Sequence, residues 1–422
     1  MRVLLVGSGG REHALGWKLT QSPLVAELIS LPGNPGLAQL GSVIPDVDVL
    51  DVGAIAAIAQ QQQIDLVVVG PEAPLAVGLA DALRRSGIPA FGPDRYGAQL
   101  ESSKTFAKEV MTRAGIRTAA YRSFDDPRAA DDHLASLDPP FVVKADGLAA
   151  GKGVLVTNDR AEASMWAADC LDPDRFGEDA RVVIEDHLAG PEISVFAICD
   201  GSSAMPLQPA RDYKRLRDGD EGPNTGGMGS YSPATDLPAD LVEFTMDQVV
   251  APVMKAMAAD GHPYIGFLYV GYVLTDSGPS VLEFNCRLGD PETQAVVPLL
   301  ESDLAELLMA AATGDLGSRE PQWNDQAAVN VVMAAQGYPV DPRRGDRIKG
   351  LANLDPGTLV FHAGTGRDDG PLVTAGGRVL NVVGLGSDVE SARQSAYAAV
   401  GRIRFHGMQF RSDIAADVEG AG

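Results

Sequence analysis

One segment of the sequence combines lysines and glycines in a pattern that suits phosphate binding. Residues 141–154 read F-V-V-K-A-D-G-L-A-A-G-K-G-V. The apolar start predicts a strand that ends near Lys144, and small residues around Gly151 and Gly153 let the backbone approach a polyphosphate closely. The segment is not a Walker A loop, because the fourth intervening residue and the final Ser or Thr are missing. A hairpin with solvated lysines is the alternative.

A second segment, residues 281–287, reads V-L-E-F-N-C-R and predicts the end of a strand. The two-residue period places Glu283 and Asn285 on one face, with Leu282, Phe284 and Cys286 on the other. A carboxylate and an amide oxygen on a rigid strand suit Mg²⁺, which completes its shell from phosphates and water. Arg287 would point toward the same rim and bind an anion. An edge strand with a solvated polar face is the alternative.

The N-terminal turn, G-S-G-G-R-E-H at residues 7–13, follows a predicted strand and opens a predicted helix. Its backbone N–H groups would face an anion at the helix N-terminus. The turn is not a dinucleotide fingerprint, because Glu12 stands where the third glycine belongs. A tight turn without a ligand is the alternative. Residues 70–74, G-P-E-A-P, follow another predicted strand and should lie at the same rim.

Residues 211–230 contain almost no apolar side chains. Loops of this length in compact domains are usually either functional or disordered, so the segment either closes over a ligand or lacks order. The six histidines show no ligand spacing, which favours structural roles for them.

Short apolar runs alternate with helix-period segments through the first hundred residues, which predicts a parallel, Rossmann-like layer. Strands are expected at 3–6, 28–31, 66–69 and 89–91, and helices at 12–20, 55–63 and 75–85. Ser102 or Ser103 should cap the next helix, which should end at Gly115.

The remaining chain predicts a small α+β unit, further strands and a β-rich end. The unit at 121–188 has expected strands at 141–145, 154–156 and 182–185. Strands at 193–199, 267–274 and 280–284 follow, then a helix at 302–312. Residues 315–325 are a plausible linker. Beyond it, strands are expected at 328–333, 359–363, 372–374 and 379–384, before a last helix.

The chain has 422 residues and a formal net charge of −23, from 34 basic and 57 acidic side chains. This balance argues against broad binding of nucleic acid or an anionic membrane. Three scattered cysteines indicate neither a disulfide framework nor a zinc knuckle. Met1 and Arg2 are followed by only four apolar residues before Gly7, and no apolar run reaches 18 residues, so we expect a cytoplasmic protein.

Taken together, five motifs resemble the phosphoribosylamine–glycine ligase family of the ATP-grasp superfamily in order and spacing. They are G-G-R-E-H-A from Gly9, G-P-E-A-P-L from Gly70, K-A-D-G-L-A-A-G-K-G-V from Lys144, G-P-N-T-G-G-M-G from Gly222 and E-F-N-C-R-L-G-D-P-E-T-Q from Glu283. The resemblance covers residues 1 to about 410, and the final dozen residues carry no motif. It implies a Rossmann-like N-terminal domain at 1–100, an ATP-grasp domain at 101–320 with a mobile lid at about 119–190, and a β-rich C-terminal domain at 321–422.

The resemblance also implies roles for individual residues. Glu283 and Asn285 would hold magnesium or manganese, and Arg287 and Lys144 would be catalytic. ATP would be bound by Lys104, Lys144, Gly147, Gly151, Lys152, Gly153, Glu185, Asp186, Leu188 and Glu192. The amine and glycine substrates would contact Gly9, Gly10, Arg11, Glu12, His13, Asp212, Lys214, Arg215, Asn224, Thr225, Gly226, Met228, Asp290, Pro291, Glu292 and Thr293.

The implied reaction joins glycine to 5-phospho-D-ribosylamine, with ATP converted to ADP and phosphate through a glycyl phosphate. Many ATP-grasp enzymes carry a second acid on the preceding strand, whereas residues 267–272 offer none, which leaves the number of metal ions open. A monomer with transient contacts to other purine-pathway enzymes is expected. Another ATP-grasp carboxylate ligase and a nucleotide-binding protein without turnover are the competing hypotheses.

Overall fold

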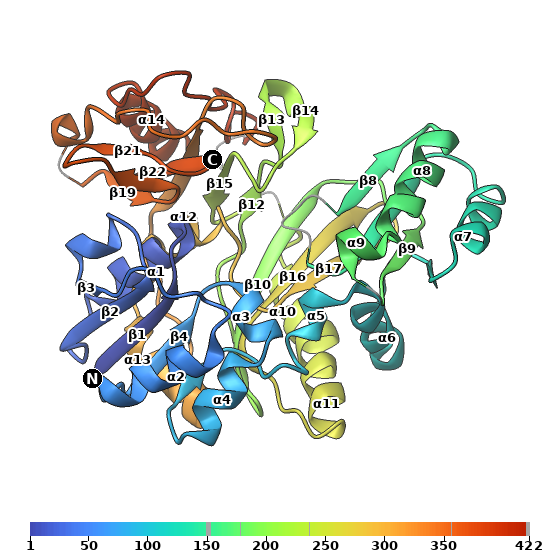
Figure 1. The fold of residues 1–422 in the computed structure, drawn as a ribbon, viewed down its shortest axis with the longest axis horizontal. Coiled ribbons are helices and arrows are strands. Elements are labelled where there is room, and N and C mark those ends of the chain that lie inside the picture. The colour runs from blue at the N-terminus through green and yellow to red at the C-terminus, as the bar shows by residue number, and fades with distance from the viewer. Residues whose placement is uncertain (149–152, 178, 236, 356, 419–422) are drawn as a thin grey trace.

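The computed structural model describes all residues except 149–152, 178, 236, 356 and 419–422. Four sheets of four or five strands form the framework (Figure 1). Among the described residues, none of the helices combines the length and the apolar character needed to span a bilayer.

The N-terminal sheet is parallel, as the sequence predicts, because its apolar strands are buried between helices. Its order is β3 (Ser42–Val43), β2 (Glu27–Pro32), β1 (Arg2–Gly7), β4 (Leu66–Val69) and β5 (Ala90–Phe91). The accompanying helices are α1 (Gly10–Leu19), α2 (Val52–Gln61), α3 (Glu72–Ala76) and α4 (Leu79–Arg85). The single helix expected at 75–85 is wrong, because Gly78 adopts a left-handed conformation with φ of +90° and separates α3 from α4.

Two short helices, α5 (Gln99–Ser102) and α6 (Lys104–Ala114), lead into a small antiparallel sheet. The predicted cap is confirmed, since Ser103 Oγ accepts from the Phe106 N–H at 3.1 Å and Gly115 ends α6 in the left-handed region. The sheet has the order β6 (Tyr121–Phe124), β9 (Arg181–Glu185), β7 (Phe141–Asp146) and β8 (Val154–Thr157). Three helices flank it, α7 (Pro127–Leu134), α8 (Arg160–Cys170) and α9 (Pro173–Phe176).

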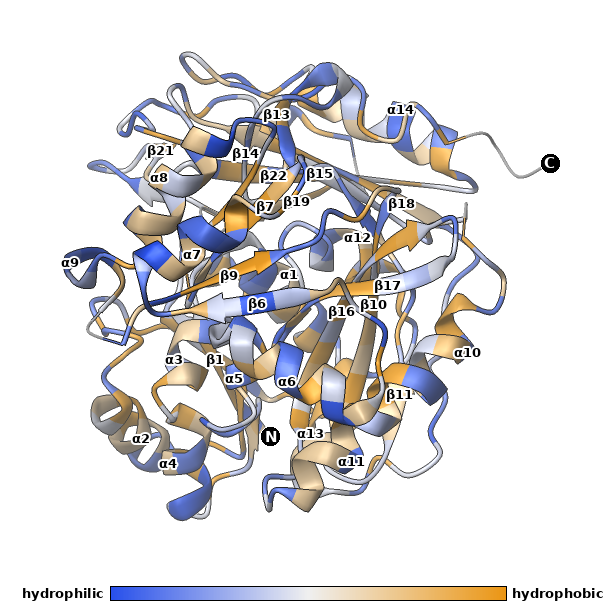
Figure 2. Ribbon diagram, turned by 90° about the vertical axis from the view of Figure 1, so that its right-hand side faces the viewer, coloured by the Kyte–Doolittle hydropathy of each residue, from blue (hydrophilic) through white to orange (hydrophobic). Residues whose placement is uncertain are grey.

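This unit has a hydrophobic core of its own, formed between the sheet and α7 and α8. Figure 2 shows mainly apolar colour on the central strand β9 and polar colour on much of the edge strand β6. The sequence analysis missed β6, because three of its four residues lack strong apolar character. The predicted antiparallel arrangement of the other three strands is confirmed.

The third sheet is antiparallel and contains the long central strand β16 (Ile265–Thr275), eight of whose residues are buried. Its order is β11 (Ala204–Pro206), β10 (Glu192–Asp200), β16 and β17 (Gly278–Asn285). Helices α10 (Leu241–Thr245), η3 (Met246–Val250) and α11 (Ala251–Ala259) precede β16, and α13 (Leu304–Thr313) confirms the helix expected at 302–312. The sequence analysis did not predict the helices at 241–259.

The fourth sheet combines strands from the middle and the end of the chain. Its order is β12 (Arg211–Asp212), β15 (Gly229–Ser232), β18 (Ala327–Ala334), β22 (Arg378–Gly386) and β19 (Leu359–His362). Helix α14 (Val389–Val400) packs on β18 and β22. Between β12 and β15 lies the hairpin of β13 (Arg215–Arg217) and β14 (Glu221–Asn224), so the polar segment at 211–230 is ordered.

Smaller elements complete the fold. They are η1 (Leu37–Gln39), η2 (Asp218–Asp220), α12 (Thr293–Val296), η4 (Val297–Leu299), η5 (Leu351–Asn353) and the hairpin of β20 (Thr365–Arg367) with β21 (Leu372–Thr374). All three cysteines are buried and free.

His13 and His362 form a buried contact between the first helix and the fourth sheet. The His362 backbone N–H donates to His13 Nδ1 at 2.7 Å, and the two rings lie 5.4 Å apart. Burial, together with the neighbouring His362, lowers the pKa of His13 to about 3. Burial and the charge of Arg367 lower the pKa of His362 to about 4. Both rings are therefore neutral at neutral pH.

We expect this pair to make folding sensitive to acid. The unfolded chain binds more protons than the folded chain between the usual histidine pKa of 6.5 and these lowered values, so stability is lost as pH falls through this range. His13→Gln should reduce the pH dependence of the free energy of unfolding, measured by urea denaturation, by up to about 1.4 kcal/mol per pH unit. The exposed His406→Gln is the control. An unchanged slope in His13→Gln would contradict this account.

Candidate functional site

A cavity of about 360 Å³ opens where the N-terminal sheet, the small antiparallel unit and the third and fourth sheets meet. Seven basic and seven acidic side chains are among the described residues that line it. Buried charges are tolerated only when they are paired or hydrogen-bonded, and here the cationic and anionic side chains are equal in number.

The lysine cluster consists of Lys104, Lys108 and Lys144. Lys144 Nζ on β7 lies 2.9 Å from Glu185 Oε2 on β9, and Lys108 Nζ lies 3.2 Å from the same oxygen. Lys108 also donates to Thr118 Oγ1 at 2.7 Å. Burial lowers the pKa of Lys108 to about 8, although Glu185 opposes that shift. One buried carboxylate therefore holds two ammonium groups at the cavity wall.

Lys104 joins this cluster from the first turn of α6. Its backbone N–H donates to Asp146 Oδ1 at 2.5 Å and its Nζ donates to the Gly147 carbonyl at 3.1 Å. The end of β7 and Gly147 are thus tied to α6. Apolar side chains complete this part of the wall: Leu100, Ala107, Met111, Leu148, Val154, Leu282 and Phe284. An apolar slot beside three ammonium groups can hold a flat base and its phosphates.

Glu283 and Asn285 line the cavity at the end of β17, as the sequence predicts. Burial favours the neutral acid, but Lys214, Lys144, Lys104 and Arg287 outweigh it and lower the pKa of Glu283, which keeps the carboxylate charged. The predicted separation of the two faces fails at Leu282 and Phe284, which also line the cavity, and β17 shifts register against β16 at Leu282. Cys286 is buried, and burial raises the pKa of its thiol.

The Glu283 and Asn285 side-chain oxygens suit a hard divalent cation. Neither side chain makes a hydrogen bond to another residue in the described part of the chain. No group of three or more histidine, cysteine, aspartate or glutamate side chains there is arranged to hold a metal alone. Mg²⁺ usually takes one or two oxygen ligands from the protein and its other ligands from phosphates and water. The Glu283 and Asn285 oxygens therefore fit that ion.

The arginine cluster consists of Arg11, Arg287 and Arg378, from three different segments. Arg287 Nη2 lies 2.7 Å from Glu101 Oε1, and its Nε lies 3.2 Å from Glu72 Oε2. Burial opposes ionisation of Glu72, but Arg287 and Arg11 lower its pKa. The two carboxylates hold Arg287 at the strand end where the sequence predicts an anion-binding group.

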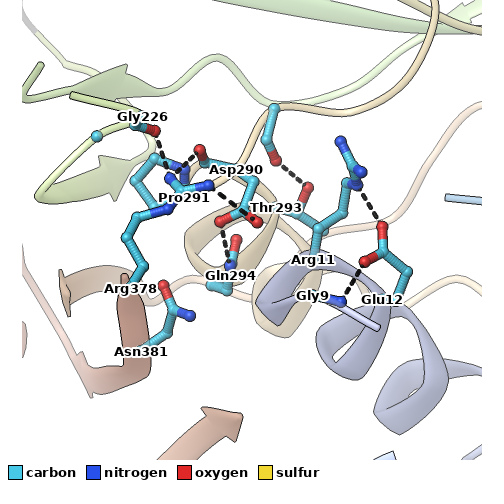
Figure 3. Close-up of polar contacts among 12 residues, drawn as sticks. Gly9, Arg11, Glu12, Gly226, Asp290, Pro291, Thr293, Gln294, Arg378 and Asn381 are labelled. Atoms are coloured by element: carbon cyan, nitrogen blue, oxygen red, sulfur yellow. Dashed lines mark hydrogen bonds and ion pairs between the residues drawn. The ribbon is translucent and has the colours of Figure 1, made fainter. Parts of the chain in front are cut away.

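Figure 3 shows the surroundings of Arg11 and Arg378. Arg378 Nη2 lies 3.3 Å from Asp290 Oδ2, and Nη1 donates to the Asp290 carbonyl at 2.5 Å. Gln294 Nε2 donates to Asp290 Oδ1 at 2.9 Å. Burial opposes ionisation of Asp290, but Arg378 and Arg11 lower its pKa. The side chains that reach this region come from residues 11, 290, 294 and 378, so only the tertiary fold assembles it.

Glu12 occupies the N-terminal turn that the sequence analysis expected to face an anion. The Gly9 N–H donates to Glu12 Oε2 at 2.6 Å, and Glu12 Oε1 lies 2.6 Å from Arg11 Nε. A Cβ at Gly7 would lie 2.5 Å from the Glu12 side chain. The glycines here make room for a carboxylate of the protein itself, which orients Arg11 toward the cavity.

Asp212, Lys214, Tyr269 and Glu292 form a further part of the wall. Burial, with the neighbouring Asp212, raises the pKa of Glu292 to about 7. Burial also raises the pKa of Asp212. Burial opposes the charge on Lys214, but Asp212 and Glu192 raise its pKa, so it stays cationic. A carboxyl group with a pKa near 7 can accept or donate a proton at neutral pH.

The structure brings together 15 of the predicted site residues at the cavity. They are Arg11, Lys104, Lys144, Gly147, Gly153, Glu185, Asp212, Lys214, Thr225, Gly226, Glu283, Asn285, Arg287, Asp290 and Glu292. Gly151 and Lys152 lie outside the described residues.

The other predicted site residues lie around the cavity and do not line it. His13 packs against Phe361 and His362. Met228 is buried, and Arg215 and Asn224 are exposed on the hairpin. The Asp186 N–H donates a hydrogen bond to the Ala120 carbonyl, and Glu192 forms an ion pair with Lys214. The others in this group are Gly9, Gly10, Glu12, Leu188, Pro291 and Thr293.

Lys108, Arg378, Glu101 and Tyr269 line the cavity and were not predicted as site residues. Lys108 follows Lys104 by four residues, which places both on one face of α6, so helical spacing could have found it. Arg378 stands at the start of a strand with no motif around it, and no signal in the sequence points to it.

The chain matches the models of all three domains of phosphoribosylglycinamide synthetase: the N domain over residues 1–101, the ATP-grasp (A) domain over 102–293 and the C domain over 328–417. It is 50% identical to phosphoribosylamine–glycine ligase from Streptomyces coelicolor, with all of both chains covered. It is 49% identical to the enzyme of that name from Caulobacter vibrioides, over 98% of this chain and 97% of the relative.

Solved structures agree with this assignment. Phosphoribosylamine–glycine ligase from Thermotoga maritima is 36% identical and superposes with a TM-score of 0.86, with 98% of this chain and 100% of that chain covered. The biotin carboxylase domain of 2-oxoglutarate carboxylase from Hydrogenobacter thermophilus is 16% identical with a TM-score of 0.75, over 97% and 91% of the chains, and shares the fold. The sequence, the fold and the cavity therefore agree that this chain belongs to the phosphoribosylglycinamide synthetase family.

Proposed function

We propose that this enzyme uses ATP to join glycine to 5-phospho-D-ribosylamine, releasing glycinamide ribonucleotide, ADP and phosphate. The observation that carries the proposal is a single cavity lined by the lysine cluster, the Glu283 and Asn285 oxygens and the arginine cluster. Full-length relatives at about 50% identity are named for this ligation. A cytoplasmic location and a monomeric state remain predictions from the sequence.

The lysine cluster would bind ATP. Lys104 and Lys144 present ammonium groups beside the Gly147 turn, where the phosphates would lie, and the apolar slot next to Met111 would accept the base. The predicted contacts of Asp186, Leu188 and Glu192 with the nucleoside remain part of this proposal. A bound magnesium ion, held by Glu283, Asn285 and phosphate oxygens, would neutralise charge on the transferring phosphoryl group. Manganese is the predicted substitute.

The chemistry needs an activated carboxylate, because a free carboxylate is a poor electrophile. A glycine carboxylate oxygen attacks the γ-phosphorus of ATP, an O–P bond forms, and the bond to the β–γ bridging oxygen breaks with release of ADP. Phosphoryl transfer of this kind depends on positioning and electrostatic stabilisation. Lys144 and Arg287, whose charges Glu185 and Glu101 hold in place, would supply that stabilisation.

The second step consumes the resulting glycyl phosphate. The amine nitrogen of phosphoribosylamine attacks the carbonyl carbon, the carbon–oxygen bond to phosphate breaks, and the nitrogen loses a proton. Glu292, with a pKa of about 7, lies in the cavity wall and can take that proton. A water-excluding cavity would protect the intermediate from hydrolysis.

The arginine cluster would bind the phosphate of phosphoribosylamine. Arg11 and Arg378 flank Asp290, and each guanidinium has several N–H donors suited to phosphate oxygens. The N-terminal turn and the segments at 224–228 and 290–293 would surround the sugar.

The direct test is ADP formation with magnesium-ATP, with and without glycine and with and without phosphoribosylamine generated in place. We expect release that requires both substrates. Release that is indifferent to glycine but responds to another carboxylate would assign the chain to a different ligation, and ATP binding without release would indicate a protein without turnover.

Glu283→Gln should abolish most turnover in that assay while the fold is retained. The substitution keeps the side-chain shape but removes the charge facing the metal and the lysines, so kcat should fall at least about 100-fold. Exposed Glu109→Gln is the matched control. Near-normal glycine-dependent ADP release in Glu283→Gln would show that the metal assignment is wrong.

Arg378→Met should weaken binding of phosphoribosylamine selectively. Charge-assisted hydrogen bonds contribute about 1.5–3 kcal/mol, so KM for phosphoribosylamine should rise about 10-fold to 100-fold while KM for ATP stays within two-fold. Arg402→Met removes an exposed arginine of the same region of the sequence and serves as the control. A matching rise in KM for ATP would contradict the assignment of Arg378 to the phosphate.

A further inference from the structure

The C-terminal segment at residues 411–417, which carries no motif, packs against the β13–β14 hairpin. Figure 1 shows the hairpin at the same end of the molecule as α14. The hairpin is flanked by cavity residues on both sides, Asp212 and Lys214 before it and Thr225 and Gly226 after it. Whatever fixes the hairpin therefore also fixes this part of the cavity wall.

Arg411 makes the first set of contacts between the segment and the hairpin. Its side chain is 1% exposed, and it forms two bonds of 2.7 Å to Asp413. Nη1 lies 2.6 Å from Asp220 Oδ1 in the hairpin turn, and the guanidinium lies 5.0 Å above the Tyr213 ring. A fully buried arginine needs such partners, so it joins the turn and Tyr213 to the C-terminal segment.

Tyr213 makes the second set of contacts with the segment. In the sequence it lies between the two cavity residues Asp212 and Lys214. Its hydroxyl donates to Asp417 Oδ1 at 2.7 Å and accepts from the Ala415 N–H at 2.9 Å. Burial raises the pKa of Tyr213, so the hydroxyl keeps its proton and remains a donor.

The C-terminal segment is itself held by α14. Tyr397 Oη donates to the Arg411 carbonyl at 2.7 Å, and Arg393 Nε donates to the Ile414 carbonyl at 3.0 Å. On the side that faces the hairpin, Asp413 Oδ2 of the segment accepts a hydrogen bond from the Gly219 N–H at 2.8 Å. A continuous chain of contacts thus runs from the C-terminal helix to the cavity wall.

We propose that Arg411 and Asp417 are positioning residues that act through Tyr213 on the binding of glycine and phosphoribosylamine. Asp212 and Lys214 line the same cavity as Glu283 and Glu292, so a small displacement of Tyr213 changes the field in which those substrates bind. The ATP-binding lysines stand on α6 and β7. Within the described residues, the segment makes no hydrogen bond or ion pair to either element. This inference rests on the proposed function.

The experiment compares Tyr213→Phe, Asp417→Ala and Asp417→Asn. Tyr213→Phe keeps the ring beneath Arg411 but removes both hydroxyl hydrogen bonds, to Asp417 and from the Ala415 N–H, whereas Asp417→Ala removes only the first. One lost hydrogen bond corresponds to about a five-fold effect. We expect KM for glycine or phosphoribosylamine to rise about five-fold in Asp417→Ala and by at least that factor in Tyr213→Phe, with KM for ATP unchanged. Asp417→Asn keeps an oxygen acceptor and should restore most of the loss. The double variant should be no worse than Tyr213→Phe alone.

Tyr96→Phe is the matched control, since it removes a tyrosine–aspartate hydrogen bond of 3.0 Å to Asp260. Asp260 directly follows α11, which lies at the opposite end of the molecule from the hairpin (Figure 1). Equal rises in all three KM values together with a lowered thermal midpoint would overturn the proposal, because they would show a merely structural role. Unchanged kinetics would also overturn it. The wild-type requirement for both substrates is measured first, so a failure of the proposed function would appear before any variant is compared.

Discussion

Balanced burial of charge is the constraint on which the site depends. The cavity brings cationic groups into a region with little water, where an unpaired charge costs several kcal/mol. Each cationic cluster has a carboxylate fixed by another segment: Glu185 for Lys108 and Lys144, Glu101 for Arg287, and Asp290 for Arg378. The formal charges of the side chains that line the cavity therefore cancel, although the whole chain carries a formal charge of −23.

This balance explains why several sheets must meet at one place. The carboxylate on β9 and the lysine on β7 belong to one small sheet, while Arg378 reaches the cavity from the fourth sheet. A near-neutral cavity that receives ATP, a glycine carboxylate and a sugar phosphate gains several negative charges. A divalent cation bound to the Glu283 and Asn285 oxygens together with the phosphates would offset part of that negative charge.

Short-range patterns predicted much of this architecture. The alternation of apolar runs and helices gave the parallel N-terminal layer, and the two-residue spacing identified Glu283 and Asn285 on their strand. Patterns failed where long-range contacts decide the outcome. Residues 211–230 could not be classified from their polarity, because their order depends on Arg411 and Tyr213, which lie almost 200 residues apart. Arg378 acquires its role only from a partner on another segment, Asp290.

The central claim is that the cavity activates the carboxylate of glycine by transferring a phosphoryl group to it. The most direct measurement uses glycine with ¹⁸O in both carboxylate oxygens and determines the isotope content of the phosphate released in a single turnover. Attack by the carboxylate on the γ-phosphorus predicts that one labelled oxygen appears in phosphate and the other stays in the amide. Phosphate without label, formed together with glycinamide ribonucleotide, would contradict the account.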